Sequence, residues 1–459
     1  MRGISTAFLI ALLYAGLASA GTGGKVVLTT SDYISGNTAA FDLGTGVFAD
    51  NLLGHYQDAY VRTYGRRVFI IEGGDNSNII RLDMDTLKTP VYQYSVGTGS
   101  NPHDLVFAPT AAYLKGYVLR YNKPSIWVVN LDAAKAGDFK LGEIDISAWN
   151  DADGSPEAHL GCYWNGYVYV ALQRYDLNAF SSGTAVLIKI NPATDTLVDM
   201  DPAAPGVQGV NLIRKNPVAG SLVGGTLYLA GTTYGASDEG VWSVDLQNPA
   251  NGQKVVVTEK ALGAFVAGLY VPFPEYAVVS TYNAAYEMVP HPLNFVTGEL
   301  LSPLPVPDAG GGMVLVDGFL YIGSRNRENP GLYIVRPGDE KAAVGFHPTS
   351  LPPLTIAYAG GEDMTGIREE APAAFTLEQA HPNPFNPSTS LSFTIARGGR
   401  VTLAVYTVAG QKAAVLYDSR MAPGRHTVVW DARGMSSGVY IVRLSDGKTS
   451  RATKVTLVK

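Results

Sequence analysis

The 459-residue chain has a single cysteine, Cys162, and only 16% charged residues. One cysteine cannot form an intramolecular disulfide, so the fold depends on its apolar core, for which a chain of this length has ample material. Because Cys162 stands between Gly161 and Tyr163 in an aromatic, strand-like stretch, we interpret it as a small buried apolar side chain.

Basic clusters and catalytic serine motifs are missing as well. The longest basic stretch is "GRR" (65–67), and the formal net charge is −6. Nucleic-acid binding requires a basic patch, so we exclude nucleic acid as a partner. The one G-x-S-x-G pattern, "GMSSG" (434–438), lies in the strand-rich C-terminal region without the strand-to-helix setting of a nucleophile elbow, and no motif pairs a serine with one of the 7 histidines. The glycines of "DAGGGMV" (308–314) lack the strand and helix that frame a phosphate-binding loop.

No apolar run at the N-terminus is long enough for a transmembrane anchor. The run "AFLIALLYAGL" (7–17) falls short of the roughly 20 residues that span a bilayer. Arg2 precedes it and the small residues "ASA" (18–20) follow it. This pattern predicts a secretory signal peptide over residues 1–20 with cleavage after Ala20. The residue directly after Ala20 is Gly21 and not a cysteine, so lipid attachment there is not expected.

Turn-forming residues and tyrosine are abundant, with 51 Gly, 27 Pro and 26 Tyr, and few stretches have a helical period. This composition favours an all-β protein. Seven times, an apolar run ends at a polar residue followed by turn residues and a new strand. The seven positions are Asp42, Asp83, Asn130, Asn191, Asp245, Asn294 and Arg336, separated by 41, 47, 61, 54, 49 and 42 residues. Such a period is typical of four-stranded propeller blades, and Asp or Asn can accept hydrogen bonds from backbone N–H groups in the turn.

The repeat predicts a seven-bladed β-propeller over residues 22–359. The first strand, "KVVLTT" (25–30), has no strand before it, whereas the strand 352–359 has no hairpin after it. We therefore expect 352–359 to join the first blade and close the ring, which removes an exposed sheet edge. Six or eight blades stay open as alternatives because the segment 138–161 is long enough for an insertion. The region loosely resembles secreted seven-bladed propellers of the YVTN and quinoprotein-like type, a likeness of architecture that does not assign a function.

The last hundred residues form a second region. Residues 360–374 are polar and acidic, as expected of a linker, and residues 375–459 contain short strands separated by turn signals. Alternation of apolar and other residues, as in "VTLAVY" (401–406), predicts strands with one face in a core. We expect a small Ig-like antiparallel β-sandwich.

Specific motifs occur in this C-terminal region: "PNPFNPST", "VYTVAGQK", "APGRHTVVWDARGMSSGVYIVRL" and "KVTLVK". In order and spacing they resemble the module shared by type IX secretion sorting domains and the Ig-like domain of flagellar hook-capping (FlgD-like) proteins. The matching positions are Pro382, Asn383, Pro384, Asn386, Pro387, Gly410, Gly424, His426, Trp430, Asp431, Ser437, Gly438 and Tyr440. Thr407 and Gln411 depart from the family's usual Asp and Arg. The resemblance implies passage across the outer membrane by its secretion machinery, followed by removal of the module; a purely structural sandwich is the alternative.

Charged residues just before the innermost strands of a propeller are the candidates for a ligand site near its axis. They are Asp58, His103, Asp104, Glu157 and His159. Two histidines with carboxylates could bind a divalent metal or act as acid and base. Their spacing carries no metal signature, and hydrogen bonding between blades is the structural alternative, which we favour.

The loop "NDADGSPE" (150–157) offers a second candidate site. Asp151, Asp153 and Glu157 resemble a calcium loop, but the EF-hand pattern is incomplete. We therefore interpret the segment as a solvated loop. No cofactor is predicted, and a divalent metal is left open.

The sequence thus predicts an exported protein, secreted or at the cell surface, in which the propeller acts as a binding or scaffold module. Its partner would be an extracellular protein, a glycan or a small molecule. Two alternatives remain: an enzyme of the lactonase, lyase or quinone-dependent type that uses an axial pocket, and a subunit of a surface layer or filament.

Overall fold

The computed structural model describes residues 23–233, 238–273, 276–294, 298–337, 342–360, 376–378, 380–395, 399–407, 411–421, 424–446 and 450–459. The chain divides into two compact units, which we describe in turn. The predicted signal peptide with Ala20, nearly all of the predicted linker and Gly410 lie outside the described residues.

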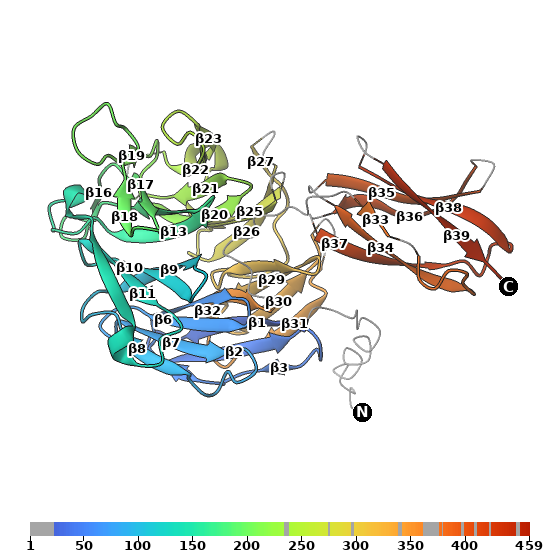
Figure 1. Ribbon diagram of the computed structural model, residues 1–459, viewed down its shortest axis with the longest axis horizontal. Helices are drawn as coiled ribbons and strands as arrows, with labels where there is room; N and C mark the ends of the chain where they lie inside the picture. The colour runs from blue at the N-terminus through green and yellow to red at the C-terminus, as the bar shows by residue number, and fades with distance from the viewer. Residues whose placement is uncertain are drawn as a thin grey trace. The chain divides into compact units, whose positions relative to one another are not determined.

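Residues 23–360, where described, form seven antiparallel sheets of four or five strands (Figure 1). Sheet 1 is β32 (Pro353–Ala359), β1 (Lys25–Ser31), β2 (Gly36–Asp42) and β3 (Phe48–Ala49), with β4 (Gly54–His55) also on β2. Sheet 2 is β5 (Ala59–Tyr64), β6 (Arg67–Glu72), β7 (Asn78–Asp83) and β8 (Tyr92–Ser95). Sheet 3 is β9 (Pro102–Pro109), β10 (Leu114–Arg120), β11 (Ser125–Asn130) and β12 (Lys140–Asp145). Sheet 4 is β13 (Ala158–Trp164), β14 (Tyr167–Leu172), β17 (Val186–Asn191) and β18 (Thr196–Val198), with β19 (Val210–Asn211) also on β17.

The other three sheets repeat the same up-and-down order. Sheet 5 is β20 (Pro217–Val223), β21 (Thr226–Gly231), β22 (Gly240–Asp245) and β23 (Gln253–Thr258). Sheet 6 is β24 (Val266–Phe273), β25 (Tyr276–Tyr282), β26 (Met288–Asn294) and β27 (Glu299–Leu300), preceded by the one-turn helix α1 (Glu259–Leu262). Sheet 7 is β28 (Met313–Val316), β29 (Phe319–Ser324), β30 (Gly331–Val335) and β31 (Gly345–Pro348).

Sheet 1 combines strands from both ends of this unit. β32 pairs antiparallel with β1, with Lys25 opposite Ala359 and Val27 opposite Ala357. Figure 1 shows β32 beside β1 although more than 300 residues separate them. The pairing covers an edge of β1 that would otherwise expose a row of unpaired backbone groups.

The innermost strand of each sheet, called its first strand below, is β32 in sheet 1 and the earliest strand in the chain in every other sheet. These strands are neighbours in space. β32 contacts β28 and β5, β9 contacts β5 and β13, and β13 contacts β20. Sequential sheets that meet through their first strands in this way form a β-propeller, in which these strands surround the axis.

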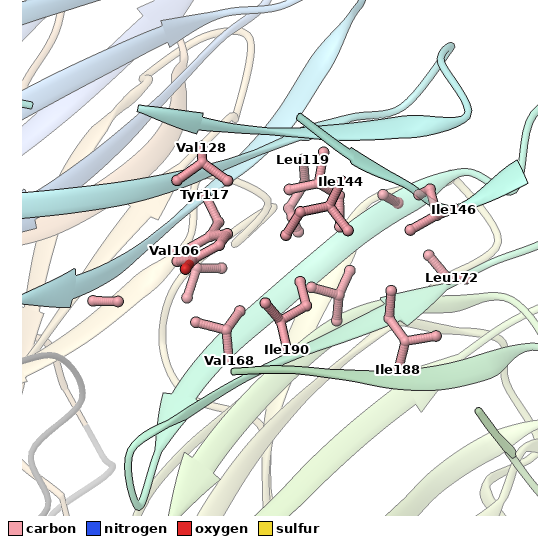
Figure 2. Close-up of a cluster of buried hydrophobic side chains, with 14 of the residues drawn as sticks. Val106, Tyr117, Leu119, Val128, Ile144, Ile146, Val168, Leu172, Ile188 and Ile190 are labelled. Carbon is pink, nitrogen blue, oxygen red and sulfur yellow. The ribbon is translucent and has the colours of Figure 1, made fainter. Parts of the chain in front are cut away.

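Clusters of buried apolar side chains lie between five pairs of consecutive sheets in the described part of the chain. Between sheets 3 and 4, Val106, Leu119 and Val128 pack with Val168 and other buried residues of the facing sheet (Figure 2). All seven residues of β10 are buried, because both faces of its sheet lie against neighbours. Equivalent clusters lie between sheets 1 and 2, 2 and 3, 4 and 5, and 7 and 1.

Five of the seven repeated polar residues accept turn hydrogen bonds as the sequence predicts. Asp42 Oδ1 accepts from Gly44 N at 3.0 Å and from Thr45 N at 2.9 Å. The side chains of Asp83, Asn130, Asn191 and Asp245 likewise accept from the N–H two residues later. The polar side chain thereby satisfies turn N–H groups and fixes where one strand ends and the next begins.

The irregular spacing of the repeat has a local cause. The hairpin β15 (Tyr175–Asp176) and β16 (Ser181–Ser182) is inserted between β14 and β17. Residues 199–209 form a further excursion before β19. The long segment 138–161 holds β12, the 3-10 helix Ser147–Trp149 and the start of β13, so it contains no additional sheet; a second 3-10 helix is Ala136–Asp138.

The C-terminal unit is a sandwich of two antiparallel sheets. One is β33 (Thr376–Leu377), β34 (Ser388–Ile395) and β37 (Gly424–Asp431). The other is β36 (Lys412–Met421), β35 (Gly399–Thr407), β38 (Gly438–Ser445) and β39 (Ser450–Leu457). Val401, Leu403 and Val405 on β35 pack in one core with Phe393 of β34 and Trp430 of β37, as their alternation predicts.

Candidate functional site: a cavity at the propeller axis

A cavity of about 510 Å³ lies among the first strands of the propeller. Residues of β32, β5, β9, β13, β20, β24 and β28, one strand from every sheet, line it. Its volume is in the range of pockets that bind small molecules. The cavity therefore lies on the axis, where the sequence placed its candidates.

Two of the predicted histidines face each other in this cavity. Nδ1 of His103 on β9 lies 2.8 Å from Nδ1 of His159 on β13, so one ring donates a hydrogen bond to the other. Burial lowers the pKa of both rings, to about 4 for His159 and well below 6.5 for His103, which also faces the neighbouring ring. At neutral pH the pair is therefore uncharged.

An aromatic ring fixes the position of His103. The Tyr121 ring stacks on His103 with centroids 3.9 Å apart and an interplanar angle of 18°. The Tyr121 hydroxyl donates to Gln173 Oε1 at 2.7 Å, and Gln173 Nε2 donates to Pro217 O at 2.7 Å. This chain of contacts crosses from sheet 3 to sheet 5 and limits rotation of the imidazole.

The charged groups in the cavity neutralise each other. Arg62 Nε donates to Asp104 Oδ1 at 2.7 Å, and Asp104 Oδ2 accepts from Gly161 N at 3.0 Å. Asp104 is 6% exposed. The guanidinium and the backbone N–H thus supply a donor to each oxygen of the Asp104 carboxylate.

Asp58 contacts a residue that lines the cavity. It does not line the cavity, but its carboxylate accepts a hydrogen bond from the Tyr60 hydroxyl, and Tyr60 does line it. Burial raises the pKa of the Asp58 carboxyl, and burial together with Asp58 raises the pKa of Tyr60. Asp58 is therefore a positioning residue for Tyr60.

The structure brings together three of the five predicted residues, His103, Asp104 and His159, and places Asp58 and Glu157 outside the lining. Sequence reasoning missed Arg62, Tyr60 and Thr355. Tyr60 and Arg62 alternate along β5 with the buried Ala59 and Val61, a pattern that could have indicated a polar face toward the axis. Cys162 also lines the cavity, but it is 5% exposed and burial raises the pKa of its thiol, so it is unsuited to act as a thiolate nucleophile.

Glu157 belongs to the acidic loop with Asp151 and Asp153. One oxygen of each of the three carboxylates lies within 4.8 Å of the others. Glu157 is 0% exposed, so the expectation of a solvated loop is wrong for this residue. Burial, followed by the charges of Asp151 and Asp153, raises the pKa of Glu157 to about 8.

A second cavity, of about 420 Å³, lies beside this loop. Tyr121, Tyr175 and Phe180 are among the residues that line it, and Phe180 is 78% exposed. Tyr121 thus contacts both the second cavity and His103 of the axial one.

In the C-terminal unit, the proline-rich motif is bound to the last strand. Asn383 Nδ2 donates to Lys454 O at 3.0 Å, and Asn383 Oδ1 accepts from Thr456 N at 2.8 Å. Phe385 N donates to Thr456 O at 2.9 Å. The peptide bonds preceding Pro382, Pro384 and Pro387 are cis.

The other motif residues of this unit have structural partners. The rings of Phe385 and Trp430 lie 5.0 Å apart, and the rings of Trp430 and Tyr440 5.6 Å apart. The Tyr440 hydroxyl donates to Ser436 O at 2.7 Å, and Asp431 accepts from Arg433. Asn386 is exposed, and Gly438 opens β38.

Comparison with known proteins identifies the C-terminal unit. Residues 379–459 match the family described as "Secretion system C-terminal sorting domain". A search of curated proteins finds no match. Among the described residues no helix is both long and apolar enough to cross a membrane.

Solved structures similar to the chain include several propellers. A Kuenenia stuttgartiensis hydrazine synthase chain has 15% identity and a TM-score of 0.47, over 66% of this chain and 96% of that one. The β-propeller domain of the Pyrococcus furiosus Trilobed protease has 11% identity and a TM-score of 0.41, over 70% and 93%. The Dos1 propeller has 10% identity and a TM-score of 0.44, over 89% and 90%. Because these TM-scores are below 0.5, the fold assignment rests on the strand pairing described above.

Proposed function

We propose that this exported propeller is a binding protein whose axial cavity takes a small uncharged molecule rich in hydroxyl groups, such as a mono- or disaccharide. The observation that carries the proposal is the convergence of all seven first strands on one cavity with paired polar groups. A rigid ring of strands presents such groups in a fixed geometry, which lowers the entropic cost of binding.

The charges of the lining select the class of ligand. Arg62 and Asp104 form an ion pair, and His103 and His159 are neutral at pH 7, so these four polar groups carry no net charge. An ionic ligand would lose its hydration without gaining an opposite charge, whereas hydroxyl groups could exchange hydrogen bonds with imidazole nitrogens. Tyr60 and Tyr270 supply aromatic surface for the apolar face of a sugar ring.

Ligand screening by calorimetry tests this proposal. The full chain would be titrated with uncharged mono- and disaccharides and, separately, with sugar acids and amino sugars. Both ring nitrogens of His159 contact protein groups, Nδ1 that of His103 and Nε2 the Val218 carbonyl oxygen at 3.4 Å, whereas among the described residues His103 is hydrogen-bonded through Nδ1. We therefore expect an uncharged sugar to bind and His103→Gln to weaken its binding about tenfold, because a hydrogen bond contributes roughly 1.4 kcal/mol. His291→Gln is the matched control, since His291 on β26 does not line the cavity. Preferential binding of charged sugars, or equal affinity of the two variants, would contradict the proposal.

For the C-terminal unit we propose delivery to the outer-membrane secretion machinery, followed by surface attachment or release with removal of the module. The sorting-domain match at residues 379–459 supports it. Mass spectrometry of native material should find a mature C-terminus before residue 379. An intact Lys459 on protein retained in the periplasm would argue against delivery.

A further inference from the structure

The loop 150–157, between β12 and β13, brings three carboxyl groups together, and no Lys, Arg or His among the described residues forms an ion pair with them. Asp151, Asp153 and Glu157 each present a carboxylate oxygen within 4.8 Å of the other two. Ligand oxygens that lie about 2.4 Å from a shared calcium ion can be at most about 4.8 Å apart. The spacing of the three oxygens therefore fits one coordination sphere.

Hydrogen bonds hold the three carboxylates in place. Asp151 Oδ1 accepts from Asp153 N at 3.1 Å, and Asp153 Oδ1 accepts from Ser155 N at 3.0 Å. Glu157 Oε2 accepts from Tyr175 N at 2.9 Å. These donors are all backbone N–H groups, so the oxygens are oriented by the chain itself.

Two of the other carboxylate oxygens lack donors. Glu157 is 0% exposed, yet its Oε1 has no hydrogen-bond partner among the described residues, and the same holds for the buried Oδ2 of Asp151. None of the ion pairs found in the described part of the chain includes Asp151, Asp153 or Glu157. A buried carboxylate oxygen without a donor or cation is costly, so the site is incomplete as an all-protein arrangement.

We propose that Asp151, Asp153 and Glu157 bind a calcium ion. Three hard oxygen ligands suit calcium or magnesium, and calcium tolerates the irregular coordination that a loop can offer, whereas magnesium demands near-ideal octahedral geometry. Water and nearby carbonyl oxygens would complete the sphere. The site is separate from the axial cavity, which none of these three residues lines.

The same carboxylates anchor the inserted hairpin. Tyr175 N donates to Glu157, and Leu177 N donates to Asp153 Oδ2 at 2.9 Å. Tyr175, Leu177 and Phe180 all line the second cavity. An ion that fixes Asp153 and Glu157 would therefore hold the hairpin β15–β16 and the wall of that cavity.

Calcium titration of the full chain, stripped with a chelator, tests the site. We expect one equivalent to bind with a dissociation constant of about 10⁻⁴ to 10⁻³ M, as in extracellular calcium modules. Calcium at 10 mM should raise the melting temperature, because it binds only the folded chain. Glu157→Gln and Asp151→Asn should each weaken calcium binding at least tenfold. Asp201→Asn, which changes an exposed carboxylate in the loop between β18 and β19, should leave calcium binding unchanged.

Two results would overturn the proposal. A proton shared among the carboxylates would leave the melting temperature independent of calcium, and Glu157→Gln would then be neutral or stabilising. Calcium binding that Glu157→Gln and Asp151→Asn leave unchanged would place the ion elsewhere. Limited proteolysis reports on the hairpin: we expect calcium to slow cleavage within residues 175–182, and saturable binding with unchanged cleavage would refute the anchoring role.

Discussion

The contact between Lys115 and Asp195 predicts a large effect of a small substitution. Lys115 of β10 is 6% exposed, and its Nζ donates to Asp195 Oδ1 at 2.9 Å, to Asp195 Oδ2 at 2.8 Å and to Pro192 O at 2.9 Å. Asp195 lies in the turn between β17 and β18, so the pair connects sheets 3 and 4. The Tyr117 hydroxyl also donates to Asp195.

Asp195→Asn removes the charge and keeps the shape. It also tolerates the left-handed backbone at this position, where φ is +55°. Removing one partner of a buried pair costs about 3–5 kcal/mol. The Asp195 side chain is 33% exposed, so water screens part of this loss, and we expect unfolding to become easier by about 2–3 kcal/mol.

Urea unfolding followed by circular dichroism measures the change. The matched control is Asp85→Asn, because Asp85 pairs with Arg66 where both side chains are exposed, and such pairs contribute at most about 1 kcal/mol. Replacing both partners, with Lys115→Met and Asp195→Asn, should restore much of the loss, since no buried charge remains. Equal effects of Asp195→Asn and Asp85→Asn, or a double variant no better than the single one, would refute the reasoning.

Three further predictions concern the cavity and the C-terminal unit. The folded-state pKa values of His103 and His159 lie below 6.5, so the unfolded chain takes up protons first on acidification. The free energy of unfolding should therefore fall between pH 6.5 and about 4, by at most about 3 kcal/mol for His159. Replacing both histidines by Gln should flatten the pH dependence of the melting temperature. Cys162 should resist iodoacetamide until the chain unfolds, because it is 5% exposed; labelling at the rate of a free thiol would contradict its burial. Phe385→Ala should destabilise the C-terminal unit by about 3–5 kcal/mol, since Phe385 is 2% exposed against Trp430; faster proteolysis of residues 376–459 in the full chain checks this, and an unchanged rate would contradict it.

The strands could be predicted from sequence because their signals are local. The stretch "KVVLTT" became β1, and the turns at Asp42 and Asp83 formed as their side chains suggested. The alternation of Val401, Leu403 and Val405 placed β35 correctly. Each of these features depends on neighbours within a few residues, so a single sequence carries the information.

The cavity was harder to predict because it depends on closure of the ring. His103 and His159 are 56 residues apart, and only the packing of β9 against β13 brings their rings together. The partner of Asp104, Arg62, lies on another sheet and has no sequence signature. Glu157 was misread as solvated: it is buried, and its hydrogen-bond donor Tyr175 lies on the hairpin β15–β16, an insertion that no repeat reveals.

The closure of the ring by β32 has a mechanical consequence. Lys25 and Ala359 are register partners at one end of an antiparallel strand pair, so the chain enters and leaves the propeller at the same end of this ladder. Tension applied between the two ends would open this ladder one rung at a time, as a zipper opens, and would not load all its bonds together as shear does. A propeller tethered through its C-terminal segment would therefore first yield to force at the seam between β1 and β32.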